Sequence, residues 1–195
     1  MTEKKHAAGS RGQASADTAA RLLQAAMAEF AEAGFSGTDS NRIARRAGYA
    51  PQTFYRWYAD KTAIFIAVYR DWEEQEMQLL TKLVAAQAAP ARLAEAIIRH
   101  HQTHRRFRHS LRQLTVSDAS VAQAREDSRR RQVARIRALY GLPAAQTAPL
   151  LIRLLQIERL ADAAADGELR ALGLSRARLR AAIAQLIAPV QAPGR

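Results

Sequence analysis

Three histidines in the segment RHHQTHRRFRHS are the residues of this chain best suited to chemistry by type and spacing. His100 and His104 lie one helical turn apart, and His101 and His104 have nearly the same separation, at which imidazoles can share a zinc ion. The same residues continue the apolar face of a helix. They could therefore line a pocket for a polar or anionic ligand, or lie hydrogen-bonded at the edge of a core. A pocket at this place would be lined by Tyr69, Trp72, His100, His101, His104 and Phe107.

The surrounding sequence argues against catalysis. No acidic ligand or general-acid pair accompanies the histidines at a useful spacing, and the chain has no cysteine for a thiolate site, a disulfide or a nucleophile. We therefore expect no enzymatic activity, no catalytic residues, no metal site and no cofactor. An enzyme that binds a metal through the histidines is kept as an alternative.

The sequence pattern predicts that the segments carrying these residues, and the rest of the chain, are helical. Glycine and proline separate segments with apolar residues at three- and four-residue spacing, and no segment alternates as a strand would. The sequence predicts an all-α fold after a flexible basic tail at 1–16, with Asp17 as the N-cap of the first helix. The longer expected helices are at about 17–33, 61–87, 91–107, 110–117, 120–140, 147–165 and 176–188.

The segment from Thr38 to Tyr58 predicts two short helices that cross at a tight turn. Ala44 is small enough for a close crossing, Gly48 tolerates the positive φ that the turn requires, and Pro51 suits the first position of the second helix. This is the pattern of a helix-turn-helix over residues 38–57. The side chains expected in its small core are Ile43, Tyr49, Phe54 and Trp57.

The outward face of the second helix carries amide, hydroxyl, phenol and guanidinium groups. Such groups hydrogen-bond base edges in the major groove of DNA or bind its phosphates. Any helical hairpin with a glycine turn shares part of this pattern, so spacing alone also fits a structural hairpin. The residues expected to face outward are Pro51, Gln52, Thr53, Tyr55 and Arg56.

The run AGFSGTDSNRIARRAGYAPQTFYRWYADKTAIF resembles the tetracycline-repressor (TetR) family of bacterial regulators. The resemblance covers residues 18–70 by motif and the remainder only by size and helical layout. The sequence departs from the family pattern at Ser40, Ala50, Gln52 and Thr62, where the family has an apolar residue, serine, glycine and glutamate. The shared marks are Gly34-Phe35, Thr38, Ile43-Ala44, Ala47-Gly48, Thr53-Phe54-Tyr55, Trp57-Tyr58 and Lys61.

The resemblance implies an N-terminal three-helix domain that binds double-stranded DNA at a palindromic operator. Phosphates would be bound by Thr38, Tyr55, Trp57 and Lys61, with Asn41, Arg42 and Arg45 in reach of others. The major groove would face Pro51, Gln52, Thr53 and Arg56. Basic tail residues Lys4, Lys5 and Arg11 would add contacts in an adjacent groove, or be merely solvated.

The resemblance also implies that a C-terminal helical domain binds a small-molecule effector and forms a homodimer. We expect a DNA-binding domain at 17–60 and a regulatory and dimerisation domain at 61–195. An ordinary internal core explains the apolar stripes of the last two helices nearly as well as a dimer interface does. The expected interface residues are Leu150, Leu151, Leu154, Leu155, Leu179, Ile183, Leu186 and Ile187.

The composition fits a cytoplasmic regulator. The net charge of +12 suggests an acidic partner such as nucleic acid, and no apolar run is long enough for a membrane span or a signal peptide. The arginines between residues 125 and 137 are expected to lie on a helix with its side chains in solvent. Together with this composition, the resemblance implies a cytoplasmic, homodimeric repressor that a ligand releases from DNA. A ligand-independent DNA-binding protein with a purely dimerising C-terminal domain is the alternative.

Overall fold

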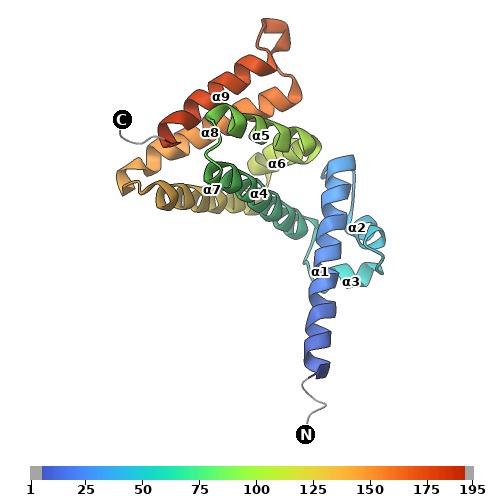
Figure 1. Ribbon diagram of the computed structural model, residues 1–195. Coiled ribbons are helices and arrows are strands. Elements are labelled where there is room, and N and C mark those ends of the chain that lie inside the picture. The colour runs from blue at the N-terminus through green and yellow to red at the C-terminus, as the bar shows by residue number, and fades with distance from the viewer. Residues whose placement is uncertain (1–5, 192–195) are drawn as a thin grey trace. The chain divides into compact units, whose positions relative to one another are not determined.

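The fold was analysed in a computed structural model that describes the backbone of residues 6–191 and the side chains of residues 16–188. Every regular element in this range is a helix (Figure 1), as the sequence predicts, and none of them is long and apolar enough to cross a membrane. The chain divides into two compact units, residues 1–69 and 70–195. The division falls within α4 (Lys61–Ala85), whereas the sequence analysis placed the domain boundary before Lys61.

The N-terminal unit contains α1 (His6–Ala33), α2 (Ser40–Arg46), α3 (Pro51–Tyr55) and the first turns of α4. Its centre is aromatic. The Phe65 ring meets the rings of Phe30 and Phe35 edge-on, at 5.0 Å and 5.3 Å between centroids. Because Phe65 lies in α4, the start of that helix belongs to the core of this unit, which is why the division follows Tyr69.

Local signals in the sequence set the turns of this unit. Gly34 has a φ of 71° after α1, and the chain then places Phe35 on Phe30 with ring centroids 6.0 Å apart, as expected for a Schellman-type ending. Gly48 has a φ of 81° in the turn between α2 and α3. Pro51 begins α3, and Ala50 before it makes no side-chain cap. The predicted helix-turn-helix is therefore present.

Two expectations for this unit differ from the structure. The first helix starts at His6, so Asp17 lies inside α1 and does not cap it; the alanines of this segment are strong helix formers. Trp57 is 39% exposed instead of lying in the core, because α3 ends at Tyr55 and Trp57 falls in the turn that follows. Lys4 and Lys5, and the side chain of Arg11, lie outside the described residues.

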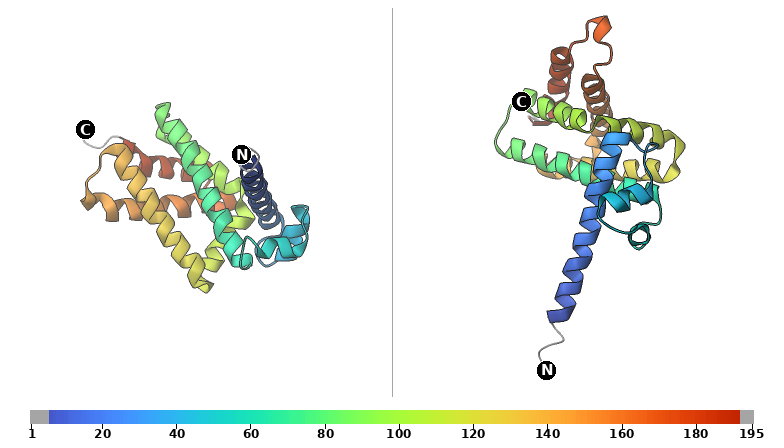
Figure 2. Two further views of the ribbon diagram at one scale, coloured as in Figure 1. Left: turned by 90° about the horizontal axis from the view of Figure 1, so that it is seen from below. Right: turned by 90° about the vertical axis from the view of Figure 1, so that its right-hand side faces the viewer.

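The C-terminal unit is a bundle of helices (Figure 2). They are the second half of α4, α5 (Pro90–Thr103), α6 (Arg105–Ser117), α7 (Ala119–Tyr140), α8 (Thr147–Asp166) and α9 (Arg176–Gln191), with short 3₁₀ turns at Ala144–Gln146 and Arg170–Leu172. The expected helix over 91–107 ends at Thr103. His104 leaves the helical conformation, with φ −110° and ψ 29°, and α6 begins directly after it.

An apolar core joins α5, α8 and α9. Leu93, Ile97 and Ile98 of α5 pack with alanines of α8 and with the apolar stripe of α9. That stripe is Leu179, Ile183 and Ile187, for which a dimer interface was expected; all three are at least 93% buried within a single chain. These three residues therefore form the internal core, the reading that the sequence left open beside the dimer.

The other residues expected at the dimer interface differ in exposure. Leu150 is buried, whereas Leu151, Leu154 and Leu186 are half-buried. Leu155 is 47% exposed, and its neighbour Ile152, which the sequence analysis did not single out, is 58% exposed. The apolar surface that α8 leaves uncovered therefore centres on Ile152 and Leu155.

Candidate nucleic-acid interface and C-terminal polar network

A buried carboxylate holds the two halves of the helix-turn-helix domain together. Glu29 of α1 is 5% exposed and accepts a hydrogen bond from the Thr38 hydroxyl at 2.7 Å. It also pairs with Arg42 at 3.3 Å and Arg46 at 3.1 Å, both on α2, and Arg46 reaches Glu32 as well. Burial raises the pKa of Glu29, but the hydrogen bonds from Thr38 and Arg46 and the charge of Arg42 outweigh it, so the pKa lies below its ordinary value.

Lys61 is also engaged inside the domain. Its Nζ donates to the carbonyl oxygens of Phe35 at 2.8 Å and Thr38 at 2.9 Å, and it lies 4.1 Å from the centroid of the Phe35 ring. Burial lowers the pKa of this ammonium group. The loop between α1 and α2 is thus fixed from both sides, by Glu29 and by Lys61. The side chains of Thr38 and Lys61, expected at phosphates, hold this loop in the unbound domain.

The outward face of the motif is arranged as the sequence predicts. Gln52 and Arg56 are exposed, Pro51 and Thr53 are half-buried beside them, and Phe54 is fully buried on the opposite side of α3. On α2, Asn41 and Arg45 are exposed. α3 therefore presents an amide, a hydroxyl and a guanidinium on one surface, which can reach base edges and phosphates together.

A hydroxyl pair links this outward face to α2. The phenol oxygen of Tyr55, a residue 56% exposed, lies 2.8 Å from the Ser40 hydroxyl. Ser40 stands at one of the positions where the sequence departs from the family pattern. The Tyr55 hydroxyl is therefore held at a fixed place on the surface without being buried, and it keeps a lone pair or a proton for a further partner.

Residues 22–68 match the family model described as bacterial regulatory proteins, tetR family. Over these residues the N-terminal unit is therefore similar to the DNA-binding domain of that family. No curated protein matched the chain. Among solved structures, the fold is similar to a protein described as a TetR-family transcriptional regulator from Rhodococcus sp., with 15% identity, a TM-score of 0.71, and coverage of 91% of this chain and 100% of that one.

Two further structures share the fold at similar levels. A transcriptional regulator from Rhodococcus sp. Rha1 is 16% identical with a TM-score of 0.65, covering 88% of this chain and 95% of that chain. A protein described as a TetR-family regulator from Mesorhizobium loti is 18% identical with a TM-score of 0.60, covering 90% and 96%. The chain thus shares the fold of these three structures over about nine-tenths of its length.

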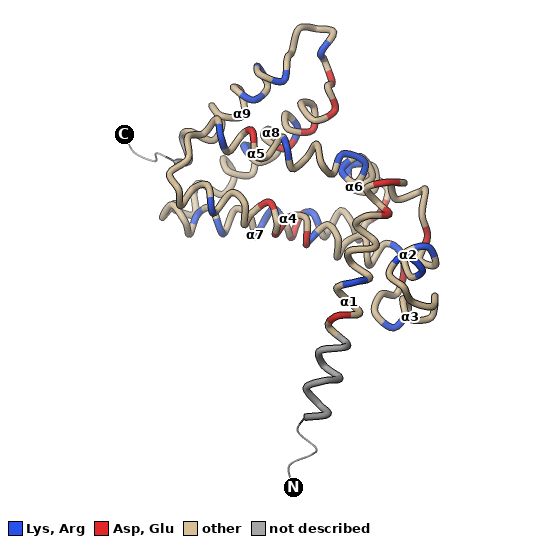
Figure 3. Tube along the Cα trace, turned by 45° about the vertical axis from the view of Figure 1, so that its right-hand side comes forward, with Lys and Arg blue, Asp and Glu red and all other residues tan. Residues whose placement is uncertain are grey.

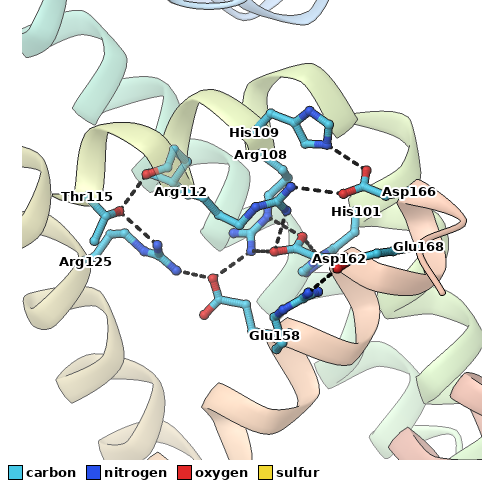
Figure 4. A network of polar contacts seen from close by, with 12 residues as sticks. His101, Arg108, His109, Arg112, Thr115, Arg125, Glu158, Asp162, Asp166 and Glu168 are labelled. Atoms are coloured by element: carbon cyan, nitrogen blue, oxygen red, sulfur yellow. Dashed lines mark hydrogen bonds and ion pairs between the residues drawn. The ribbon is translucent and has the colours of Figure 1, made fainter. Parts of the chain in front are cut away.

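The C-terminal unit contains a buried polar network (Figure 4). At its centre, Asp162 of α8 is 2% exposed and accepts from His101 Nδ1 at 2.8 Å and from Arg108 Nε at 3.1 Å. Arg108 is equally buried and bridges Asp162 and Glu158, while Arg112 reaches Asp162 at 2.8 Å. The network therefore joins α5, α6 and α8 through charges in the interior of the unit.

The network extends to α7 and α4. Arg125 is 6% exposed and contacts both Glu158 and the Thr115 hydroxyl, and Arg129 pairs with Glu158 at 2.9 Å. From α4, Glu76 lies 3.4 Å from His101 Nε2. The expectation that the arginines near residue 130 belong to a solvated helix is therefore wrong for Arg125, which lies in the interior.

The charges of this network shift one another's pKa values. Burial and the nearby Arg108 lower the pKa of His101, but its hydrogen bond to Asp162 and the Glu76 carboxylate 3.4 Å away outweigh them, so the pKa is raised. Burial raises the pKa of Glu158, yet the charges of the surrounding arginines bring it to about 2. The pKa of Asp162 is likewise held well below its ordinary value. His101 thus lies between two carboxylates, which favour its protonated form.

The histidine cluster predicted from the sequence forms, but its rings pack on one another. Trp72 stacks on His100 with 4.7 Å between centroids and meets His101 and His104 edge-on. Phe107 lies against the same indole at 6.3 Å. Tyr69 is 4% exposed and belongs to the N-terminal unit. Within the described residues, no group of three side chains is arranged to hold a metal ion.

The sequence analysis missed the partners of the histidines because they come from distant segments. Asp162 follows His101 by 61 positions, so the acidic group absent near the histidines in sequence is present in space. A signal did exist. Acidic residues recur every fourth position at 158, 162 and 166, and arginines do so at 108 and 112 and at 125 and 129. Such spacing places like charges on one helix face, which indicates an opposite charge on a neighbouring helix.

Proposed function

We propose that this chain is a homodimeric transcriptional repressor that binds a palindromic operator through α3 and is released when a small molecule occupies its C-terminal unit. The TetR-family domain with its outward Gln52, Thr53 and Arg56 is the observation that carries the proposal. Two such domains in a two-fold dimer would place their recognition helices in successive major grooves. The domains of this proposal are residues 17–60 for DNA and 61–195 for regulation and dimerisation.

The apolar surface of α8 supports the dimer. Ile152 and Leu155 are large, apolar and about half exposed, and Leu151 and Leu154 lie beside them. Joining these surfaces about a two-fold axis would remove apolar area from water, which favours association. Release then requires an effector that prefers the dimer whose recognition helices no longer match the operator. α4 runs from the DNA-binding unit into the C-terminal unit and is the covalent path for this coupling.

The contacts inside the domain divide the proposed DNA-binding residues into two groups. Arg45 makes no ion pair with the described residues, whereas Arg42 and Arg46 are paired with Glu29. We expect Arg45 and Arg56 to bind phosphates directly. Thr38 and Lys61 would act by fixing the loop before α2, and Tyr55 and Trp57 would contact the backbone from the surface.

Selection from random DNA followed by titration tests the proposal. The wild-type protein should enrich an inverted repeat and bind it in a salt-dependent manner. Arg45→Ala should reduce the slope of log affinity against log salt by about one per protomer, because it removes a phosphate contact. Gln52→Ala should change the preferred bases instead.

Arg46→Ala is the matched control on the same helix. It removes the same charge, but from a guanidinium that is bound to Glu29 and Glu32. It should lower the thermal stability of the N-terminal unit and change the salt slope less than Arg45→Ala. Failure to enrich any repeat at low salt would contradict the proposed function, and equal salt slopes would contradict the division of the arginines.

A further inference from the structure

A groove of about 700 Å³ runs between the C-terminal halves of α4 and α7. Its volume lies in the range of small-molecule sites in proteins. The lining has an apolar centre, made by Met77 of α4 and by Ile136 and Leu139 of α7, and Leu139 is 54% exposed. The other lining residues are Glu74, Gln78, Thr81, Lys82, Arg135 and Ala138.

Long side chains hold the two helices beside this groove. Arg131 of α7 pairs with Glu73 of α4 at 3.1 Å, and Arg135 pairs with Glu74 at 2.8 Å. Figure 3 shows acidic and basic residues along both helices. Two helices joined by ion pairs between such long side chains lie further apart than helices whose alanines and leucines touch. The core of α5, α8 and α9 is an example of the closer packing. Apolar side chains of α4 and α7 therefore remain accessible between them.

The charges at the two ends of the groove differ. At one end Glu74 and Arg135 neutralise each other. At the other end lies Lys82, which is exposed and makes no ion pair with the described residues. Lys82 follows Glu74 by eight positions on α4, which corresponds to about 12 Å along the helix axis. The groove is thus an apolar channel with one unpaired positive charge at its end.

We propose that this groove binds a straight-chain amphiphile with a single anionic head group. The apolar chain lies along Met77, Ile136 and Leu139, and the head group meets the Lys82 ammonium. The end of the groove at the Glu74–Arg135 ion pair limits the length of the alkyl chain that the groove can hold. That such a ligand would act as the effector rests on the proposed function, whereas its binding does not.

Calorimetric titration of the full chain with straight-chain alkanoates from hexanoate to tetradecanoate, below their micellar concentrations, tests the site. Each added methylene should tighten binding about 4-fold while it enters the groove, the ratio that corresponds to about 0.8 kcal/mol for burying one methylene. The gain should stop at roughly ten carbon atoms, where the chain reaches the length of the groove. A gain that continues without a plateau, or no dependence on length, would overturn the proposal.

Two variants separate the apolar and charged contributions. Ile136→Glu places a carboxylate in the channel and should weaken decanoate binding by at least about 10-fold. Lys82→Met should weaken decanoate by up to about 5-fold, as expected for an exposed ion pair, and leave decanol unaffected. Arg92→Met is the control, because it removes an exposed positive charge from α5 outside the groove. An equal loss in Lys82→Met and Arg92→Met would refute the placement of the head group.

Two further readouts complete the test. If Ile136→Glu abolishes self-association of the wild-type protein in sedimentation, the groove is covered by a second copy and the proposal is wrong. Operator release is measured separately with decanoate. Plateaued alkanoate binding that leaves the operator complex intact would uphold the site and contradict only its role in the proposed regulation.

Discussion

Replacing Asp162 with asparagine removes one negative charge from the centre of the buried network and keeps the side chain's shape. Asp162 accepts from His101 and Arg108 and forms an ion pair with Arg112, and both His101 and Arg108 are only 2% exposed. Without the carboxylate, Arg108 keeps a single carboxylate partner, Glu158, and His101 keeps only Glu76. The variant therefore leaves buried positive charge poorly compensated.

The expected loss of stability is about 3–5 kcal/mol, the usual cost of breaking a buried ion pair by removing one partner. The introduced asparagine side chain would also present an amide N–H₂ to groups that are themselves donors, which adds to the loss. At roughly 3–5 °C per kcal/mol for a unit of this size, the melting temperature of the C-terminal unit should fall by about 10–20 °C.

Urea unfolding followed by the fluorescence of Trp72 measures this loss, because the indole is buried beside Arg108, 4.8 Å from its guanidinium carbon. A Trp57→Phe background removes the second tryptophan of the chain. Glu168→Gln is the control. It also breaks an ion pair of the α8 end, with Arg159, but both partners are exposed, and it should cost at most about 1 kcal/mol. Equal effects of Asp162→Asn and Glu168→Gln would refute the reasoning that burial makes the network costly to break.

The remaining predictions concern pH and assembly. Because the pKa of His101 is raised in the folded chain, its stabilisation is complete below the unfolded value of 6.5 and is lost as pH rises through the folded value. The unfolding free energy of the C-terminal unit should therefore decline above about pH 6.5, and His101→Gln should flatten this slope in urea titrations at several pH values. Leu155→Arg should give a folded monomer in sedimentation velocity, since the charge would be buried only in a dimer. Ile183→Arg should instead unfold the C-terminal unit, visible as lost helical circular dichroism; a folded monomer from this variant would contradict the internal core.

The helix-turn-helix could be predicted from the sequence because its determinants are local. Gly34 and Gly48 take the positive φ that their turns require, and Pro51 begins α3 where a proline loses no hydrogen bond. Trp57 was misplaced because the length of α3 depends on packing beyond the motif. A helix one turn longer would have directed Trp57 inward with Phe54.

The polar network could not be placed from the sequence, because its ion pairs join residues 25 to 61 positions apart. Spacing within each helix indicated a charged face but not which helix would meet it. The apolar stripe on α9 raises the same difficulty. An apolar helix face indicates that another element packs on it, but the sequence does not identify that element as α5 or as a second chain. The exposure of Ile152 and Leu155 on α8 depends on which faces of that helix α5 and α9 cover, so it follows only from the three-dimensional structure.

The carboxylates of Glu29 and Glu32 bear on how the protein searches a genome. Residues 1–69 carry nine basic and six acidic side chains, and two of the basic ones, Arg42 and Arg46, are bound to these carboxylates. Residence on random DNA grows with the number of phosphates neutralised and counterions released. Arginines that are already paired with carboxylates release fewer counterions than free ones. We therefore expect the domain to leave unrelated sequences sooner than its number of basic residues alone would predict, which leaves more time for encounters with its own site.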